Sequence, residues 1–270
     1  MSRLSFARSL VVIIFTLSRI TVTSGVPTTG TPLANAHAHN DYEHSRPLWD
    51  ALDAGFTSVE ADIWLIKGEL AVAHTPFGIR SDRTLESLYL RPLQKRIKDN
   101  HGKVFSSGPP LILMIDIKTS GPETFAVLQT QLARYGDMLS GMRNGRFEER
   151  AVTVIISGNC PRKEILASTP RYAAIDGRPS DLDSTAPIHE IPMISTAWNT
   201  TFRWKGDGPM PMDERIKLRE FVRKAHTNGR QVRFWATPES VEVWKEQRAA
   251  GVDRLNTDRL DELRKFLLSK

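Results

Sequence analysis

Leu111-Ile112-Leu113-Met114-Ile115-Asp116-Ile117-Lys118 is the stretch of this 270-residue sequence that decides its fold. It is an almost unbroken apolar run, with Pro109-Pro110 before it and Gly121-Pro122 after it. Such a run is typical of a β-strand that is buried on both faces, as strands are in parallel sheets covered by helices. The stretch therefore predicts a parallel α/β protein.

Similar short runs alternate with helix-like patterns on both sides of this stretch. Eight predicted strands with helices between them fit a single (β/α)8 TIM barrel. A doubly wound sheet is the alternative, but no Gly-rich phosphate loop follows the first strand, which argues against a Rossmann domain. The predicted strands are residues 35–39, 58–65, 111–118, 151–157, 173–178, 192–197, 231–237 and 252–258, with a return strand at 70–74 after a Lys67-Gly68 turn. The predicted helices are residues 46–54, 85–98, 123–139, 212–228, 239–250 and 261–268.

The N-terminus has the pattern of a secretory signal peptide. Arg3 and Arg8 precede the short apolar run Leu10–Leu17, and small residues follow. The run is too short to span a bilayer stably, although an uncleaved membrane anchor is the alternative. We therefore expect a signal peptide at 1–25, a linker at 26–34 and the barrel at 35–270, in a protein that is secreted or located in the cell envelope.

Charge and cysteine content narrow the class of protein. The formal net charge is +6, and the basic residues are scattered. About half of that charge belongs to the N-terminal leader, so nucleic acid is not an expected partner. Cys160 is the only cysteine, so an exported form has no internal disulfide and depends on its core for stability.

Polar pairs stand where the first three predicted strands end. Active sites of barrel enzymes form at the C-terminal ends of the strands, and alternate residues of one strand share a face. Burying charged residues there without partners would be costly, so their position needs a reason. The pairs are His37 and His39, Glu60 and Asp62, and Asp116 and Lys118.

The three carboxylates predict a metal site. Glu60, Asp62 and Asp116 would repel one another at one barrel mouth unless a cation neutralised them. Oxygen ligands favour Mg²⁺, with Ca²⁺ as an alternative. Surface salt bridges to lysine or arginine are the competing explanation.

Two histidines flank these carboxylates in the sequence. His39 and His74 suit a general base and a general acid, although a lone histidine is more often a structural hydrogen bonder. Lys118 could bind a phosphoryl oxygen. Asn40 is a candidate substrate contact in the first loop, where Asp41, Tyr42 and His44 could support the site.

Later strands add candidates for substrate binding. They are Arg178, the pair Trp198-Asn199 and Trp235, and Asn256-Thr257-Asp258 ends the last strand. Each could serve packing alone. Trp235 is the strongest, because an aromatic side chain near a strand end can form a pocket wall.

The order His39, Glu60-Ala61-Asp62, His74, Asp116-Ile117-Lys118 resembles the phosphatidylinositol phospholipase C-like phosphodiesterase superfamily, which includes glycerophosphodiester phosphodiesterases and sphingomyelinase D-type phospholipases. The stretches 37–42 and 58–62 look most similar to the altered inheritance of mitochondria protein 6 family. The resemblance implies Mg²⁺ held by the three carboxylates, an acid–base pair of His39 and His74, and a phosphate contact by Lys118. It also implies cleavage of a small phosphodiester or phospholipid headgroup, with a cyclic phosphate as an alternative first product and transient contact with a membrane surface.

The first loop departs from the pattern of the glycerophosphodiesterases. They carry His-Arg-Gly there, whereas this chain has His39-Asn40-Asp41, so glycerophosphodiester specificity stays open. His37 is the alternative to His39 as the first catalytic histidine. An amidohydrolase-like enzyme would share His37-Ala38-His39 but needs histidines after the fifth and sixth strands, where this chain has Arg178 and Trp198. A barrel that binds a phosphorylated ligand or a sugar without turnover is the non-enzymatic alternative.

Overall fold

The Leu111–Ile117 run forms strand β4 in a computed structural model that describes residues 30–269. It lies between β2 (Ser58–Ile66) and β7 (Val152–Gly158) and pairs parallel with both. Apart from Asp116, every residue of β4 is buried, because neighbours cover both of its faces. The carboxylate is thus the polar end of an otherwise apolar strand.

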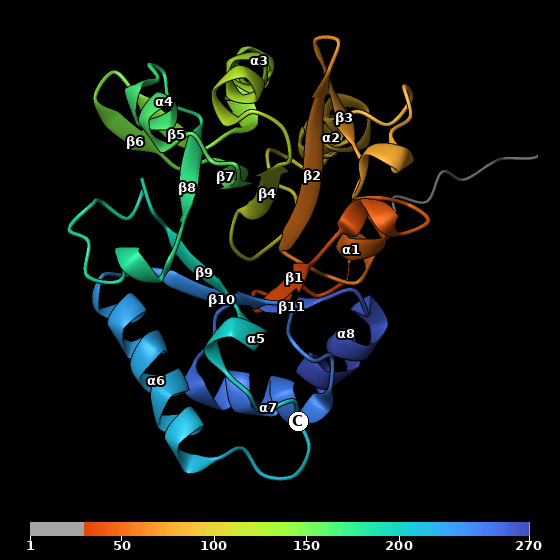
Figure 1. Cartoon of the computed structure of the whole chain (residues 1–270). Coiled ribbons are helices and arrows are strands. Elements are labelled where there is room, and N and C mark those ends of the chain that lie inside the picture. Colours follow the sequence, from red (N-terminus) through yellow and green to blue (C-terminus); the bar gives the residue numbers. More distant parts are fainter. Residues whose placement is uncertain (1–29, 270) are drawn as a thin grey trace, which may run out of the picture.

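Eight parallel strands form a nearly closed barrel, which confirms the predicted TIM-barrel fold. The strand order is β10-β9-β8-β7-β4-β2-β1-β11, and a parallel bridge between Arg233 and Arg254 brings β10 next to β11. The remaining barrel strands are β1 (Ala36–Ala38), β8 (Ala173–Gly177), β9 (Met193–Ala197), β10 (Gln231–Trp235) and β11 (Leu255–Thr257). Figure 1 shows α2 and α3 on one side of these strands and α6, α7 and α8 on the opposite side.

The helices present apolar faces to the strands. In α6, Leu218, Val222 and Ala225 recur at the three- to four-residue spacing of one helix face, and all three are buried. Ser240 is the N-cap of helix α7, and its side chain accepts a hydrogen bond from the amide of Val243. Gly251, in the left-handed conformation, is the C-cap of the same helix. The helices are α1 (Trp49–Asp53), α2 (Arg91–Asp99), α3 (Gly121–Arg134), α4 (Arg162–Ala167), α5 (Trp198–Thr201), α6 (Met212–Thr227), α7 (Val241–Ala250) and α8 (Leu260–Leu268).

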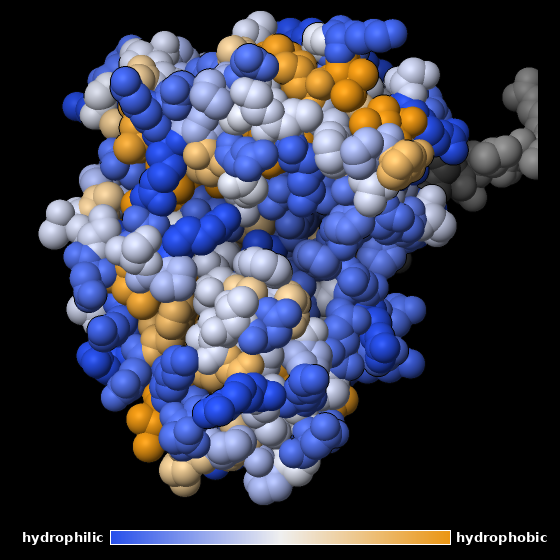
Figure 2. Space-filling view, viewed as in Figure 1, coloured by the Kyte–Doolittle hydropathy of each residue, from blue (hydrophilic) through white to orange (hydrophobic). Residues whose placement is uncertain are grey.

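A hairpin at β2 positions the second predicted histidine. Lys67 and Gly68 both have positive φ, which suits the tight turn that joins β2 to β3 (Glu69–Val72) and was expected from the sequence. His74 follows β3 and so returns to the barrel mouth. Figure 2 shows hydrophobic residues gathered at the top of the view, where Figure 1 draws β2, β3 and α2, on a face that is otherwise largely hydrophilic.

The connection after His74 is elaborated, as its length predicted. It contains a 3-10 turn (Pro76–Gly78), a π-helical turn (Glu86–Leu90) and then α2. A second hairpin was not predicted. It is formed by β5 (Gly141–Arg143) and β6 (Arg146–Glu148) between α3 and β7.

Two predicted boundaries are wrong. Leu33 was assigned to a linker, but its side chain is buried and its amide donates to the carbonyl of Gly55 at 2.7 Å, so the folded part begins before residue 35. The first helix is shorter than predicted because Leu48 has φ 67° and its amide donates to the Asp41 carboxylate, which breaks the helical path at that residue.

The predicted signal peptide and the start of the predicted linker lie outside the described residues. Within residues 30–269, no helix has the length and apolar character needed to cross a membrane.

Candidate active site

A cavity of about 300 Å³ lies at the C-terminal ends of the barrel strands. This is the end at which the sequence predicted an active site. Eight of the predicted site residues line it, and they come from six parts of the barrel. These residues are His39, Asn40, Glu60, His74, Asp116, Lys118, Arg178 and Trp235.

The three predicted metal ligands meet. One ligand oxygen from each of Glu60, Asp62 and Asp116 lies within 4.8 Å of the other two. Asp62 and Asp116 are directly paired in the register of β2 and β4, which explains their proximity. Burial raises the pKa of both aspartates, and the like charge of Glu60 adds to the effect. The Oδ1 atom of Asp62 is buried and has no hydrogen-bond partner within residues 30–269. An oxygen donor set with an unsatisfied buried atom fits a hard divalent cation.

Lys118 shares this carboxylate cluster. Its Nζ lies 3.0 Å from Asp62 Oδ2 and 3.0 Å from Asp116 Oδ1. Burial alone would lower the pKa of Lys118, but the two carboxylates outweigh it and raise the pKa. The ammonium group therefore stays charged at the mouth of the barrel, as a phosphate contact requires.

Arg233 is a site residue that sequence reasoning missed. Its Nη1 lies 2.7 Å from Glu60 Oε2, and its Nη2 lies 3.8 Å from Asp176. The side chain is almost completely buried. Burial would raise the pKa of Glu60, but Arg233 and His37 outweigh it and lower that pKa, so Glu60 is held ionised. One feature of the sequence could have indicated Arg233 as a site residue. It is a charged residue within the apolar strand Val232–Trp235, two residues before Trp235 and hence on the same face.

The hydrogen bonds of His37 and His39 separate their roles. His37 uses both ring nitrogens, Nδ1 with Ser58 Oγ at 2.7 Å and Nε2 with Glu60 at 3.1 Å. Burial and the charge of Arg233 lower its pKa to about 4. His39 instead uses Nδ1 with Asp258 Oδ1 at 2.8 Å, which leaves Nε2 available, and it lines the cavity. The geometry thus favours His39 over His37 as the reactive histidine.

His39 and Asp258 form a hydrogen-bonded pair at the cavity. Burial opposes protonation of His39, but the hydrogen bond to Asp258 and the charge of Glu60 outweigh burial and raise its pKa. A carboxylate that holds Nδ1 fixes the tautomer and presents Nε2 to a substrate. Asp258 was noted at the end of the last strand, but the sequence did not assign it this partner.

His74 is held in a comparable way by Asp62. Its Nδ1 lies 3.3 Å from Asp62 Oδ2 and 3.3 Å from the hydroxyl of Tyr42. That hydroxyl also lies 2.7 Å from Asp62 Oδ2 and 2.8 Å from Asn40 Oδ1. Tyr42, which the sequence suggested as a supporting residue, therefore ties the first loop to the second histidine. Asp41 supports the loop from the other side by accepting from Tyr89 at 2.8 Å.

The predicted substrate contacts divide into two groups. Arg178 and the partly exposed Trp235 reach the cavity, and Arg178 is anchored by Asp176 at 2.7 Å. Trp198 does not reach it and that assignment is wrong: Trp198 begins α5, is buried, and donates its indole N–H to the carbonyl of Trp204 at 2.9 Å. Asn199 follows on the exposed side of the same short helix and does not line the cavity either.

Comparison with known proteins places this site in a family. The AIM6-like phosphodiesterase domain matches residues 28–176, a stretch that contains both cavity-lining histidines and all three carboxylates. The chain belongs to the AIM6-like phosphodiesterase family. The glycerophosphoryl diester phosphodiesterase family matches residues 231–261, which span β10 to β11.

Relatives of this AIM6-like chain extend over most of its length. The altered inheritance of mitochondria protein 6 homolog of Arthroderma benhamiae is 29% identical over 82% of this chain and 80% of that protein. The protein of that name from Eremothecium gossypii is also 29% identical, over 87% of this chain and 69% of that protein. A glycerophosphodiester phosphodiesterase from Parabacteroides distasonis has a similar structure, with a TM-score of 0.57 at 17% identity over 88% of this chain and 98% of that chain. At this identity the likeness shows a shared TIM-barrel fold.

Proposed function

We propose that this AIM6-like protein is a metal-dependent phosphodiesterase that uses His39 and His74 as its acid–base pair. The observation that carries the proposal is the arrangement of these two histidines. Each directs Nδ1 to a carboxylate, Asp258 or Asp62, and both line one cavity with Glu60 and Asp116 of the carboxylate cluster. Two histidines held in this way can take a proton from an attacking hydroxyl or water and give one to the leaving oxygen.

The charges around the cavity suit a phosphodiester. Glu60, Asp62 and Asp116 would hold a divalent cation, for which we propose Mg²⁺, and Ca²⁺ is the alternative. When bound, such a cation offsets negative charge on the phosphoryl oxygens. Lys118 and Arg178 supply positive charge to the same oxygens, and Trp235 gives the cavity an apolar wall.

Activity measurements on histidine variants test the acid–base proposal. His39→Ala and His74→Ala should each lose about 10²–10⁴ in turnover, the usual contribution of a positioned proton donor or acceptor. His226→Ala is the matched control, because His226 makes the same kind of contact, to Asp253 at 2.8 Å, on the surface. The variant that removes the general acid should be rescued by a p-nitrophenyl ester, whose leaving group hardly needs a proton. Full turnover in both cavity variants would refute the mechanism, whereas absence of turnover in the wild type would favour a barrel that binds without catalysis.

The metal proposal has its own test. Chelation with EDTA should abolish phosphodiester hydrolysis, and Mg²⁺ should restore it. Isothermal titration of Mg²⁺ should show one site in the full chain, and that site should be lost in Asp62→Asn. Unchanged hydrolysis by rigorously metal-free protein would refute metal dependence while leaving the histidine proposal intact.

We also propose that the substrate is a phospholipid-like phosphodiester met at a membrane surface. Phe77 is 99% exposed on the 3-10 turn that follows His74, so an apolar side chain projects beside the active site. Phe77→Ser should lower turnover of substrate presented in vesicles while turnover of soluble glycerophosphodiesters stays unchanged. Ile216→Ser, which alters a half-exposed apolar residue on α6, is the control. Equal effects on both kinds of substrate would contradict surface contact.

Export is proposed from the sequence of residues 1–25. N-terminal sequencing of the protein from its native host should find a start near Gly25 or Val26. Protein that retains Met1 in the cytosolic fraction would contradict export.

A further inference from the structure

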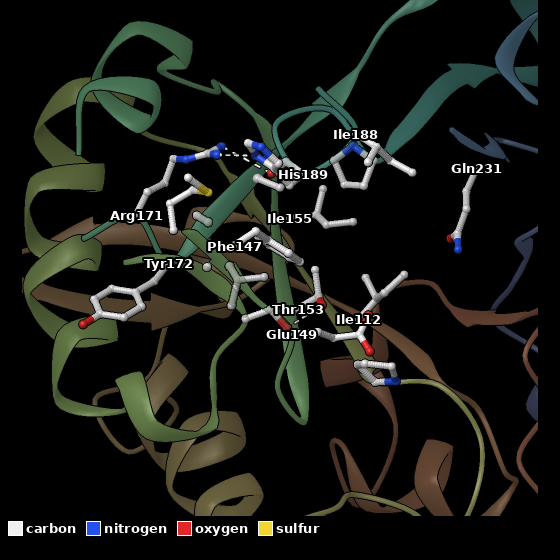
Figure 3. A pocket seen from close by; sticks show the side chains of 18 of the residues that line it. Ile112, Phe147, Glu149, Thr153, Ile155, Arg171, Tyr172, Ile188, His189 and Gln231 are labelled. Carbon is white, nitrogen blue, oxygen red and sulfur yellow. Dashed lines mark hydrogen bonds between the residues drawn. The ribbon is translucent and has the colours of Figure 1, made fainter. Parts of the chain in front are cut away.

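A second cavity, of about 340 Å³, opens at the opposite end of the barrel. It is lined by residues at or just before the starts of β4, β8, β9 and β10, which are the N-terminal ends of the strands (Figure 3). In most TIM barrels this end is closed by packed side chains. The volume falls within the range of small-molecule sites, about 300–1,000 Å³.

The walls of this cavity are largely apolar. Ile112 and Ile155, from the interior of the barrel, form its buried part (Figure 3). Phe147 on β6 and Ile188 before β9 line it while remaining 43% and 51% exposed. Phe147 also stacks on His189, with 5.5 Å between the ring centroids. Exposed apolar side chains around an opening into an apolar interior favour a ligand with an aliphatic part.

Two buried arginines line the same cavity. Arg171 is 5% exposed and Arg254 is 3% exposed. Arg171 contacts the ring and the carbonyl of His189, and Arg254 donates to Gln231 Oε1 at 2.9 Å and Thr57 Oγ1 at 2.9 Å. Arg254 also donates to the carbonyl of Ala34, and none of these partners is a carboxylate.

Neither guanidinium has an anionic partner in the described chain. Within residues 30–269, no carboxylate lies within 4.0 Å of Arg171 or Arg254, and the Nη2 group of Arg254 makes no hydrogen bond there. Burial lowers the pKa of both side chains, and the more distant charges of Glu190, near Arg171, and Asp253, near Arg254, offset this only in part. A buried charge is usually paired, so these two cations need an explanation. Glu149 also lines the cavity, but it is exposed.

We propose that this cavity binds a single-chain aliphatic carboxylate, such as a fatty acid anion. The chain would lie against Ile112, Ile155 and Phe147, and the carboxylate would pair with the buried Arg171, whose planar fork matches it. The residues before Gly30 are not suitable occupants, because they contain three arginines and no acidic residue. The site is independent of the catalytic cavity and of the proposed phosphodiesterase activity.

Isothermal titration of the full chain with three matched probes tests this proposal. Dodecanoate should bind at least ten-fold more tightly than dodecanol, which has the chain without the charge, and butyrate should not bind measurably. Dodecyl phosphate reports whether another anionic head group is accepted. Equal affinity for dodecanoate and dodecanol, tighter binding of dodecyl phosphate than of dodecanoate, or no binding of dodecanoate would overturn the proposal.

Variants locate the binding. Arg171→Met should weaken dodecanoate at least ten-fold and leave dodecanol unchanged, whereas Ala174→Leu, which fills the cavity from β8, should weaken both. His39→Ala at the other end of the barrel should change neither. Circular dichroism verifies folding, and Arg171→Lys is a second variant that keeps the charge if Arg171→Met does not fold. Loss of dodecanoate binding in His39→Ala, or wild-type affinity in Ala174→Leu, would place the ligand elsewhere and overturn the proposal.

Discussion

Replacing Arg233 by methionine should destabilise the protein more than any change to a surface arginine. Arg233 is 2% exposed in its side chain and lies 2.7 Å from Glu60, which is 6% exposed. Methionine keeps much of the volume but removes the charge, so Glu60 is left buried with an uncompensated charge. Asp176 loses less stabilisation than Glu60 does, because Arg178 still pairs with it at 2.7 Å.

The magnitude follows from the burial of the pair. Removing one partner of a buried ion pair costs about 3–5 kcal/mol. For a chain of this size, that lowers the melting temperature by on the order of 10 °C. Without Arg233, the main charge that opposes burial is lost, and we expect burial to outweigh His37 and to raise the folded-state pKa of Glu60 above the unfolded value. The loss of stability should therefore grow as the pH rises above the pKa of the unfolded carboxyl group, because the unfolded state then releases a proton that the folded state keeps.

Thermal and urea unfolding with EDTA measure this effect at several pH values. A second measurement separates it from a general packing defect, since removing Arg233 should tighten Mg²⁺ binding by leaving the carboxylate cluster more negative. Added Mg²⁺ should therefore raise the melting temperature of Arg233→Met by more than that of the wild type.

Arg215→Met is the control, because Arg215 forms a bidentate pair with Glu246 in which the two side chains are 26% and 22% exposed, and its unfolding midpoint should change much less. The reasoning would be wrong if the free energy of unfolding of Arg233→Met lay within about 1 kcal/mol of the wild-type value. It would also be wrong if Arg233→Met bound Mg²⁺ more weakly than the wild type.

Three further predictions follow from the site and its support. Asp258→Asn should move the pH limb that His39 controls to lower pH, since the carboxylate that raises the pKa of His39 is lost; the pH dependence of kcat/KM measures this, and a shift to higher pH would contradict it. Gly158→Ala should weaken Mg²⁺ binding, because a Cβ there would lie 2.3 Å from Oδ1 of Asp116, one of the metal-site carboxylates. Gly145→Ala is the control and should not weaken it, because Gly145 also has positive φ but has open space around it. Equal metal affinity in both variants would refute the steric argument. Asp41→Asn should gain stability relative to the wild type as the pH rises from about 4 to about 6, by about 3 kcal/mol, because burial raises the pKa of Asp41 from 3.8 to about 6 and the folded state keeps a proton that the unfolded state has released. Urea unfolding across this range measures the difference, and parallel curves would show that Asp41 titrates normally.

The part of the candidate site that could be predicted is the part whose residues lie on single strands. Glu60 and Asp62 are two residues apart on one strand, so the period of a strand alone places them on one face. Asp116 ends a separate apolar strand, and the barrel rule places its end beside theirs. By contrast, the contact between His39 and Asp258 joins residues more than 200 positions apart, and no local pattern indicates that pair.

Trp198 shows how strand-end reasoning can fail. It follows β9 directly, as a site residue would, but the chain turns into α5 there and the indole packs on Phe202 and Phe234. Position along the chain indicates the end of the barrel at which a residue lies. It does not indicate whether the side chain points into the mouth or outward to the helices.

The sequence by itself determined the alternation of buried strands and helices, and hence the barrel, because hydrophobic periodicity is a local property. It also determined the set of carboxylates and histidines available at one end. Only the tertiary structure decided that both ring nitrogens of His37 contact Ser58 and Glu60, and that Arg233 neutralises Glu60. It also decided that, within residues 30–269, two buried arginines at the far end of the barrel have no carboxylate partner. These are pairings between distant segments, and the free energy of a buried charge depends on which partner the fold brings within a few ångströms.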